Sequence, residues 1–337
     1  MMVPFGRACR SPERACLAAC RAVDTASLSS HPMVVEQRAE MRNNRIRPGD
    51  LTAPLFVPAN RPDRAGKAAA RGVRALVLDL EDAVATAEKP HARADAVSVL
   101  RTSSGDTCHL VRVNAMDDRD LLEADLDALS EVLDKIAAVV LPKTGTAEEV
   151  RELVEALQTR AATSPPPYVV PTIETAAGVG EAWRIAAASE HVHTLLFGSV
   201  DLSADLGVPL TADGLELLTA RSTVVMACAA AGRAKPIDGP HLNIDDAEGL
   251  MRSARHARSI GFGGKVVVHP AQLAGVRAAF APAPEEVDWA ARVVEAFEDA
   301  VKDGVAVLRL ADGTFVDAPV VARARAILQA TGTEAGR

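Results

Sequence analysis

From residue 54 onward, short apolar runs alternate with longer, Ala-rich stretches of helical character. Most of these runs are continuous rather than alternating, which is typical of parallel strands buried on both faces. The runs that we interpret as strands are 55–57, 75–78, 109–113, 138–141, 168–173, 194–197, 236–237 and 265–268. Helices are predicted between them at 64–71, 89–101, 121–135, 147–158, 178–188, 214–230 and 246–260.

This alternation predicts an α/β fold of the (β/α)₈ TIM-barrel type. Eight strand–helix units over about 230 residues match the size of such a barrel. A doubly wound open sheet is the alternative. No G-x-G-x-x-G motif follows the first apolar run, and this favours the barrel.

The two ends of the chain do not follow the barrel pattern. After residue 283, the pattern predicts a helix at 285–302, a hairpin at 305–316 with an Asp-Gly turn, and a last helix at 318–329. The first 50 residues contain no part of the pattern, and we interpret them as a disordered extension. The predicted domains are therefore the extension (1–50), the barrel (51–283) and a C-terminal helix–hairpin–helix arm (284–337).

Composition narrows the function classes. The chain has 337 residues, a net charge of −8, and only one Tyr, two Trp and seven Phe. Nucleic-acid binding usually needs a basic surface with stacking aromatics, so this class is not expected. The apolar runs are too short to span a bilayer, so no membrane association is expected. Five cysteines in a long chain do not indicate a disulfide framework, and a reducing cytoplasm is the expected location.

Polar side chains follow every predicted strand. In a TIM barrel the chemistry lies at the carboxyl ends of the strands, so these positions are candidates for an active site. An acid at such a position can also be only a helix N-cap, but eight polar strand ends together favour a site. The candidates are Asn60, Arg61, Asp79, Glu81, Asp82, Arg112, Asn114, Lys143, Glu174, Asp201, Asp238 and His269.

Two of these candidates predict a metal site. Glu174 and Asp201 follow neighbouring strands, the fifth and the sixth, and Mg²⁺ takes oxygen ligands with few from the protein. The guanidinium of Arg112 can present a planar fork to a carboxylate or carbonyl oxygen. The chain has no G-x-S-x-G motif and no Walker-type GKS or GKT. A metal, an arginine and several acids together indicate enolate chemistry, in which positive charge stabilises an oxyanion.

Several of the strings around these residues resemble the citrate lyase β-subunit and malyl-CoA lyase family of the HpcH/HpaI aldolase superfamily. The resemblance covers roughly residues 53–330, and the strings occur in the family's order. They are LFVPANRPDR, VLDLEDAV, VRVNA, LPK, IETAAGV, FGSVDLSADLG, PIDGPHLNIDD, GFGGKVVVHPAQL and GTFVDAP.

The resemblance implies roles for individual residues. Mg²⁺, or Mn²⁺ in its place, would be held by Glu174 and Asp201. Arg112 would contact substrate oxygens, and Asp79 and Glu81 would lie around the metal waters. Asp317 would come from the arm of a neighbouring subunit in a homotrimer or a dimer of trimers. A CoA or carrier thioester would contact Asn60, Arg61, Arg64, Lys143, Asp238 and His269.

The reaction implied is the retro-Claisen cleavage of a 3-hydroxyacyl-CoA, such as malyl-, citramalyl- or citryl-CoA, to a 2-oxo acid and acetyl-CoA. The reverse condensation would use the same groups. One alternative is a citrate lyase β-subunit acting on an acyl-carrier-protein thioester within a complex. Two others are a phosphoenolpyruvate-type or simple aldehyde aldolase with the same metal site, and a catalytically inactive barrel that acts as a scaffold.

Overall fold

The computed structural model describes residues 46–103, 106–161, 165–302, 304 and 307–331. The predicted extension falls almost entirely outside these residues, as do the first two positions of the predicted hairpin. Residues 46–50 are the exception. Asp50 is buried, and its carboxylate accepts a hydrogen bond from the backbone N–H of Arg47 at 2.9 Å and pairs with Arg74 at 3.2 Å. The barrel unit therefore includes residues that the sequence pattern assigned to the extension.

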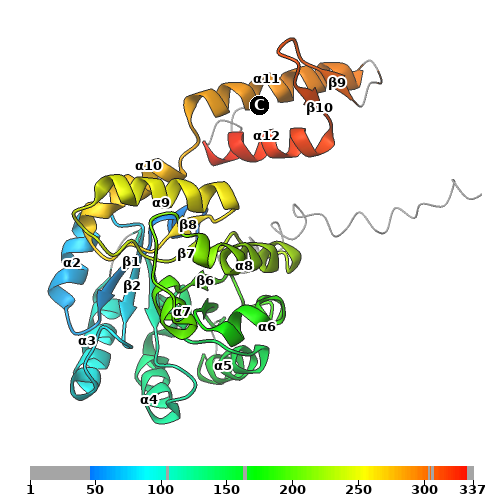
Figure 1. The fold of residues 1–337 in the computed structure, drawn as a ribbon. Coiled ribbons are helices and arrows are strands. Elements are labelled where there is room, and N and C mark those ends of the chain that lie inside the picture. The colour runs from blue at the N-terminus through cyan, green and yellow to red at the C-terminus, as the bar shows by residue number, and fades with distance from the viewer. Residues whose placement is uncertain (1–45, 104–105, 162–164, 303, 305–306, 332–337) are drawn as a thin grey trace, which may run out of the picture. The chain divides into compact units, whose positions relative to one another are not determined.

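Eight parallel strands form the centre of the barrel (Figure 1). Each of the eight predicted strands is present, and the strands follow one another around the sheet in chain order. A parallel bridge between Leu55 and Val267 joins the segment that follows the last strand to the first strand, so the barrel closes. The strands are β1 (Leu55–Pro58), β2 (Ala75–Asp79), β3 (Cys108–Arg112), β4 (Ala138–Leu141), β5 (Tyr168–Ile173), β6 (Leu196–Phe197), β7 (Ile237–Asp238) and β8 (Gly264–Lys265).

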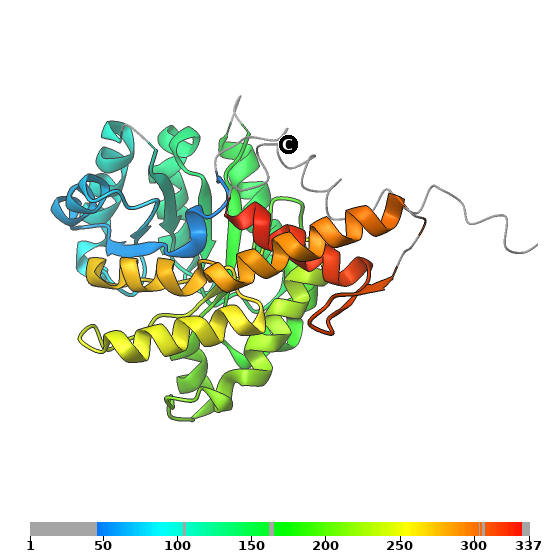
Figure 2. The same cartoon turned by 90° about the horizontal axis from the view of Figure 1, so that it is seen from above.

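The helices surround the strands (Figure 1, Figure 2). Those of the barrel are α2 (Pro62–Ala70), α3 (Lys89–Thr102), α4 (Arg119–Leu129), α5 (Ala147–Arg160), α6 (Ala176–Ala186), α7 (Ser199–Leu206), α8 (Leu218–Ala230), α9 (Ala247–Ile260) and α10 (Leu273–Phe280). The sequence pattern missed α7 and α10, which have eight residues each. Among the described residues, none of the helices is both long and apolar enough to cross a membrane.

Two apolar cores hold the barrel together. One fills its interior and includes Val77, Leu110, Val170 and Leu196, whose side chains alternate along the strands with outward-facing ones. The other lies between the strands and the helices. Burial on both faces explains why the strands appear in the sequence as continuous apolar runs.

The arm has an apolar core of its own. Helices α11 (Pro284–Lys302) and α12 (Ala318–Ala330) lie side by side (Figure 1). Val293, Val321 and Ala324 are buried in the core that they share. Strands β9 (Leu308–Arg309) and β10 (Phe315–Val316) pair antiparallel, as the hairpin prediction requires. Gly313 takes φ = 91° in the turn, a backbone conformation that glycine adopts without steric strain.

Candidate active site

A cavity of about 390 Å³ lies at the carboxyl ends of the strands. Its walls come from β1, β2, β3, β5 and β6 and from the segments that follow β7 and β8. Its apolar lining includes Leu196 and Val266 of the interior core and Phe56, which packs against that core. The polar lining comprises Arg64, Asp79, Asp82, Arg112, Thr172, Glu174, Ser199 and Asp201.

Arg112 is the best-anchored cation of this site. Its Nε and Nη2 donate to the two carboxylate oxygens of Asp79 at 2.8 and 2.6 Å, and its Nη1 lies 2.7 Å from Glu81 Oε2. Burial alone would lower the pKa of Arg112, but the hydrogen bonds and charges of Asp79 and Glu81 raise it. The guanidinium therefore stays positive. The hydrogen bonds to Asp79 engage two of its five N–H groups, and the contact with Glu81 is an ion pair, so N–H groups remain for a ligand oxygen.

Lys143 links the acids of the site. Its Nζ donates to Glu81 Oε1 at 2.8 Å and lies 3.6 Å from Asp82, while its backbone N–H donates to Glu174 Oε1 at 2.6 Å. The residue has φ = 49°, and it is the one described residue other than glycine with a positive φ. Residues held in this conformation cluster at active sites, where the surrounding contacts enforce it.

Glu174 is a buried acid among like charges. Burial, together with the negative charges of Asp201 and Glu81, raises its pKa to about 8, against the opposing hydrogen bond from the Lys143 backbone. Gly198 makes this packing possible, because a Cβ there would lie 2.3 Å from Glu174 Oε2. Ionising this buried carboxyl among like charges is unfavourable, and a bound cation would offset that cost.

These residues fit a hard divalent cation. Among the described residues, no group of three or more His, Cys, Asp and Glu could hold a metal. Two carboxylates facing one cavity suit Mg²⁺, which usually keeps several waters and takes one or two protein carboxylates. The raised pKa of Glu174 is the observation that supports the fit, since a cation would favour the ionised form that burial disfavours.

Asp238 lies elsewhere, in a buried ion-pair network. Its carboxylate accepts from Arg221 at 3.1 and 3.0 Å and from Lys265 Nζ at 2.6 Å, and it is 2% exposed. The predicted contact of Asp238 with a CoA group finds no support in this geometry, because both carboxylate oxygens already have buried cationic partners. The residue instead ties β7 to α8 and β8.

The other predicted ligand-binding residues lie after the strands but make local contacts. Arg64 lines the cavity. Arg61 is paired with Asp63 at 3.0 Å, and the His269 ring accepts from the backbone N–H of Ala271 at 3.2 Å. Asn60 lies two residues after the end of β1 and is half-buried.

Asp317 is the N-cap of α12. Its Oδ1 accepts a hydrogen bond from the backbone N–H of Val320 at 3.2 Å. This is the capping role that any acid before a helix can have. The hydrogen bond engages one of the two carboxylate oxygens, Oδ1.

Lys89 supports the site, and the sequence pattern did not single it out. It is 6% exposed, and its Nζ donates to the carbonyls of Leu80 and Glu81 at 2.8 and 3.1 Å and also to the side chain of Asn114. This lysine fixes the backbone that carries Glu81. A buried lysine at the start of a helix is indistinguishable in sequence from an exposed one, so no signal marked it.

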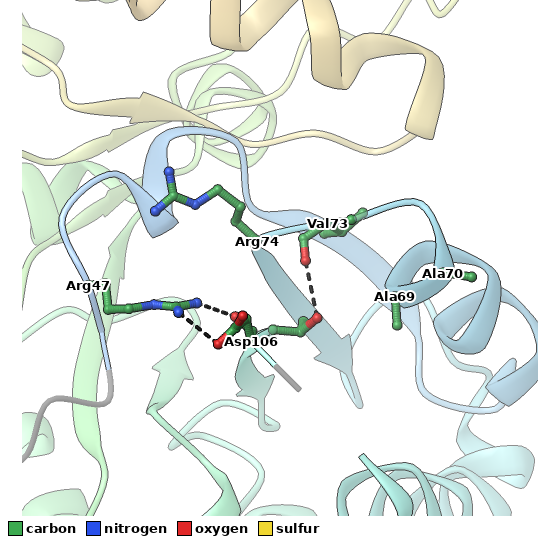
Figure 3. A pocket seen from close by; sticks show the side chains of 8 residues that line it. Arg47, Ala69, Ala70, Val73, Arg74 and Asp106 are labelled. Carbon is green, nitrogen blue, oxygen red and sulfur yellow. Dashed lines mark hydrogen bonds and ion pairs between the residues drawn. The ribbon is translucent and has the colours of Figure 1, made fainter. Parts of the chain in front are cut away.

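A second cavity, of about 630 Å³, lies at the opposite end of the barrel (Figure 3). Arg47 pairs there with Asp106 at 3.0 Å, and the Thr107 hydroxyl donates to the Val73 carbonyl at 3.2 Å. The cavity is larger than the first, but its cations are already neutralised by acids. Barrel enzymes place their chemistry at the carboxyl ends of the strands, so we assign the site to the smaller cavity.

Comparison with known proteins places this geometry in a family. The family model described as HpcH/HpaI aldolase/citrate lyase matches residues 53–270. The citrate lyase subunit beta-like protein of Mycobacterium tuberculosis is 38% identical over 284 residues, which cover 82% of this chain and 94% of the relative. The (3S)-malyl-CoA thioesterase of Cereibacter sphaeroides is 34% identical over 275 residues, 81% of this chain and 92% of the relative.

A solved structure agrees with these matches. The M. tuberculosis protein CitE, in complex with magnesium, acetoacetate and coenzyme A, superposes with a TM-score of 0.71 at 35% identity, covering 86% of this chain and 99% of that one. The predicted TIM barrel and the predicted family are both confirmed. This chain belongs to the HpcH/HpaI aldolase/citrate lyase family.

Proposed function

We propose that this protein is a Mg²⁺-dependent carbon–carbon lyase that cleaves a 3-hydroxyacyl-CoA to a 2-oxo acid and an acyl-CoA, or joins the two. The observation that carries the proposal is the buried Glu174, which shares a cavity with Asp201 and with the anchored Arg112. Solved structures from M. tuberculosis support it, because one citrate lyase beta subunit structure holds magnesium with oxaloacetate and one CitE structure holds magnesium, acetoacetate and coenzyme A.

The proposed reaction divides the work among a few side chains. A base removes the proton of the 3-hydroxyl, the bond between the second and third carbons breaks, and its electron pair passes to the thioester as an enolate. Protonation of the enolate carbon then gives the acyl-CoA. The Arg112 N–H groups that remain after its pairing with Asp79 and Glu81 stabilise the negative oxygen. When bound by Glu174 and Asp201, Mg²⁺ supplies positive charge for the oxygens of the oxo-acid half.

The acids around Arg112 act by positioning it. Asp79 accepts two parallel hydrogen bonds from the Arg112 guanidinium. These two bonds fix both the position and the orientation of the guanidinium plane. Glu81 is itself held by Lys143 and has a raised pKa, chiefly because it is buried. The ends of β2, β3 and β4 thus form one connected network, and we propose that it holds the reacting atoms in register.

The products separate this function from its rivals. Carbon–carbon cleavage gives a 2-oxo acid and an acyl-CoA, whereas the thioesterase named among the relatives would give a hydroxy acid and a thiol. Citrate lyase β-subunits are also among the relatives. If this chain worked as one, we would expect it to act on a carrier-protein thioester and to leave the CoA ester intact. Assaying oxo acid and thiol separately after incubation with malyl-, citramalyl- and citryl-CoA therefore tests the proposal.

The assembly and location remain part of the proposal. We propose a homotrimer, or a dimer of trimers, working in the cytoplasm, with the arm of one subunit covering the cavity of another. The separate apolar core of the arm supports this, because the arm can fold on its own contacts. The acyl group would then be enclosed between two subunits.

Arg112→Lys is expected to lower turnover by about 10²- to 10³-fold, the usual cost of one oxyanion donor. Lysine keeps the charge but cannot make the paired bonds to Asp79 or keep the same N–H groups aimed at the ligand. Steady-state kinetics would show the loss in kcat rather than in KM. Arg101→Lys, on an exposed surface pair with Glu131, is the control and should behave like the unchanged protein. Near-full kcat in Arg112→Lys would show that Arg112 does not act on the substrate.

A further inference from the structure

Thr172 presents a buried hydroxyl that has no partner. The residue is 2% exposed, and its Oγ1 makes no hydrogen bond to any of the described residues. Thr172 nevertheless lines the cavity. Buried hydroxyls are almost always hydrogen-bonded in folded proteins, so an unpaired one in a cavity wall needs an explanation.

The position of Thr172 on β5 shows that its side chain points into the barrel interior. Side chains alternate along β5, so Thr172 faces the same way as Glu174 above it and as Val170 below it, in the barrel interior. Leu196 is its partner in the register of β5 and β6, and Leu196 and Phe56 are among the apolar residues that line the cavity. The hydroxyl is therefore the polar group set into the apolar floor below the predicted metal ligand.

Two other buried threonines have hydroxyls that donate hydrogen bonds to backbone carbonyls. Thr194 Oγ1 donates to the carbonyls of Ala234 and Lys235 at 2.9 and 3.0 Å, and Thr144 Oγ1 donates to the carbonyl of Leu141 at 3.0 Å. Valine has nearly the shape of threonine and would fill the Thr172 position with no polar group to satisfy. A hydroxyl there contributes only if a partner arrives from the cavity.

We propose that Thr172 determines specificity for the 2-oxo-acid half of the substrate, by donating its hydroxyl hydrogen to a carboxylate oxygen of that half. The inference rests on the proposed function. The oxo-acid half is the one expected next to Thr172, because the reacting half of the substrate must lie next to Glu174 and Arg112. The nucleotide of CoA is too large for the floor of a cavity of about 390 Å³. A negatively charged oxygen is the partner for which a neutral hydroxyl donor has most effect.

The test compares Thr172→Val, Thr172→Ser and Thr172→Ala in the full-length protein with Mg²⁺ present. Oxaloacetate and pyruvate are the probes, titrated calorimetrically, and CoA is titrated separately. The Kd of the oxo acid should rise about tenfold or more in the Val and Ala variants, as expected for a hydrogen bond to a charged group. It should stay near the original value in Thr172→Ser, and the Kd of CoA should not change in any variant.

Melting temperatures without ligand give an independent readout. Thr172→Val should melt no lower than the unchanged protein, because no hydrogen bond is lost, whereas Thr194→Val should melt lower. A drop in Thr172→Val as large as that in Thr194→Val would show that the hydroxyl already has a partner, and would overturn the inference.

The outcomes also separate this inference from the function on which it rests. If the unchanged protein binds no oxo acid with Mg²⁺, the proposed function fails and the inference fails with it. If the unchanged protein binds oxo acid and the Val variant binds it equally well, the inference alone is overturned. Should Thr172→Val not fold, equal affinities in the Ser and Ala variants would overturn it in the same way.

Discussion

Glu174→Gln is expected to abolish Mg²⁺ binding and Mg²⁺-dependent turnover while leaving the fold intact. Glutamine has nearly the same shape, so it fits against Gly198 and can still accept the hydrogen bond from the Lys143 backbone. It cannot supply negative charge. Losing even the partner of a metal ligand costs about 10- to 100-fold in affinity, so losing a ligand should cost at least about 10²-fold. Calorimetric titration with Mg²⁺ measures this directly.

The pH dependence of the same titration sharpens this test. Because the pKa of Glu174 is raised from 4.5 to about 8, the acid holds its proton in the metal-free protein at neutral pH. Mg²⁺ must displace that proton, so its affinity should rise with pH up to about 8 and then level off. Without metal, the raised pKa contributes stability at low pH that is lost as the pH rises through about 8. Glu174→Gln should remove both dependences.

A matched control is available on the barrel surface. Glu155 lies exposed on α5, and Glu155→Gln should bind Mg²⁺ like the unchanged protein. Unchanged Mg²⁺ affinity in Glu174→Gln would contradict the metal assignment. A collapse of its melting temperature would instead show that the carboxylate is needed for folding.

Asp317→Asn is expected to stay folded and to lose about 10²- to 10⁴-fold in turnover, the range typical of a lost general acid or base. Asparagine keeps the oxygen that caps α12 at Val320, so the helix should survive. The control is Asp118→Asn, which changes another N-cap with the same 3.2 Å bond, on α4. If Asp317 only caps its helix, both variants should lose at most about 1 kcal/mol of stability and keep their activity.

Mixed oligomers test whether Asp317 acts in a neighbouring subunit. Subunits with Asp317→Asn and subunits with Glu174→Gln should each be inactive alone. Random assembly from equal amounts should restore about one quarter of the normal activity, because half the sites keep Glu174 and half of those meet an intact Asp317. No recovery in verified mixed oligomers would exclude a shared site. Full activity of Asp317→Asn alone would exclude any catalytic role.

The fold could be predicted because burial on both faces leaves a direct trace in the sequence. Ala138–Leu141 in β4 is such a run, and its side chains are almost completely buried. The missed helices α7 and α10 are short and begin inside strings whose polar residues suggest a site. Each has only eight residues, which are too few for a helical period of apolar positions to be recognised in the sequence.

The location of the site could be predicted from the sequence, but the ion-pair and hydrogen-bond partners of its residues could not. The rule that chemistry follows the strands brings Asp79, Arg112, Glu174 and Asp201 to one cavity, as the structure shows. The same rule failed to distinguish Asp238, because its partners Arg221 and Lys265 come from distant parts of the chain. An acid paired in the interior and an acid awaiting a ligand look alike in sequence. What separates them is the geometry of their neighbours.

The most direct test of the proposed lyase is the metal dependence of its products. Purified full-length protein, stripped with EDTA, would be incubated with malyl-, citramalyl- or citryl-CoA before and after Mg²⁺ is restored, and oxo acid, acyl-CoA and thiol would be measured together. We predict that oxo acid and acyl-CoA form in equal amounts from at least one substrate, only with Mg²⁺, and with no matching release of thiol. Thiol released together with an intact hydroxy acid, or cleavage that is indifferent to EDTA, would contradict it.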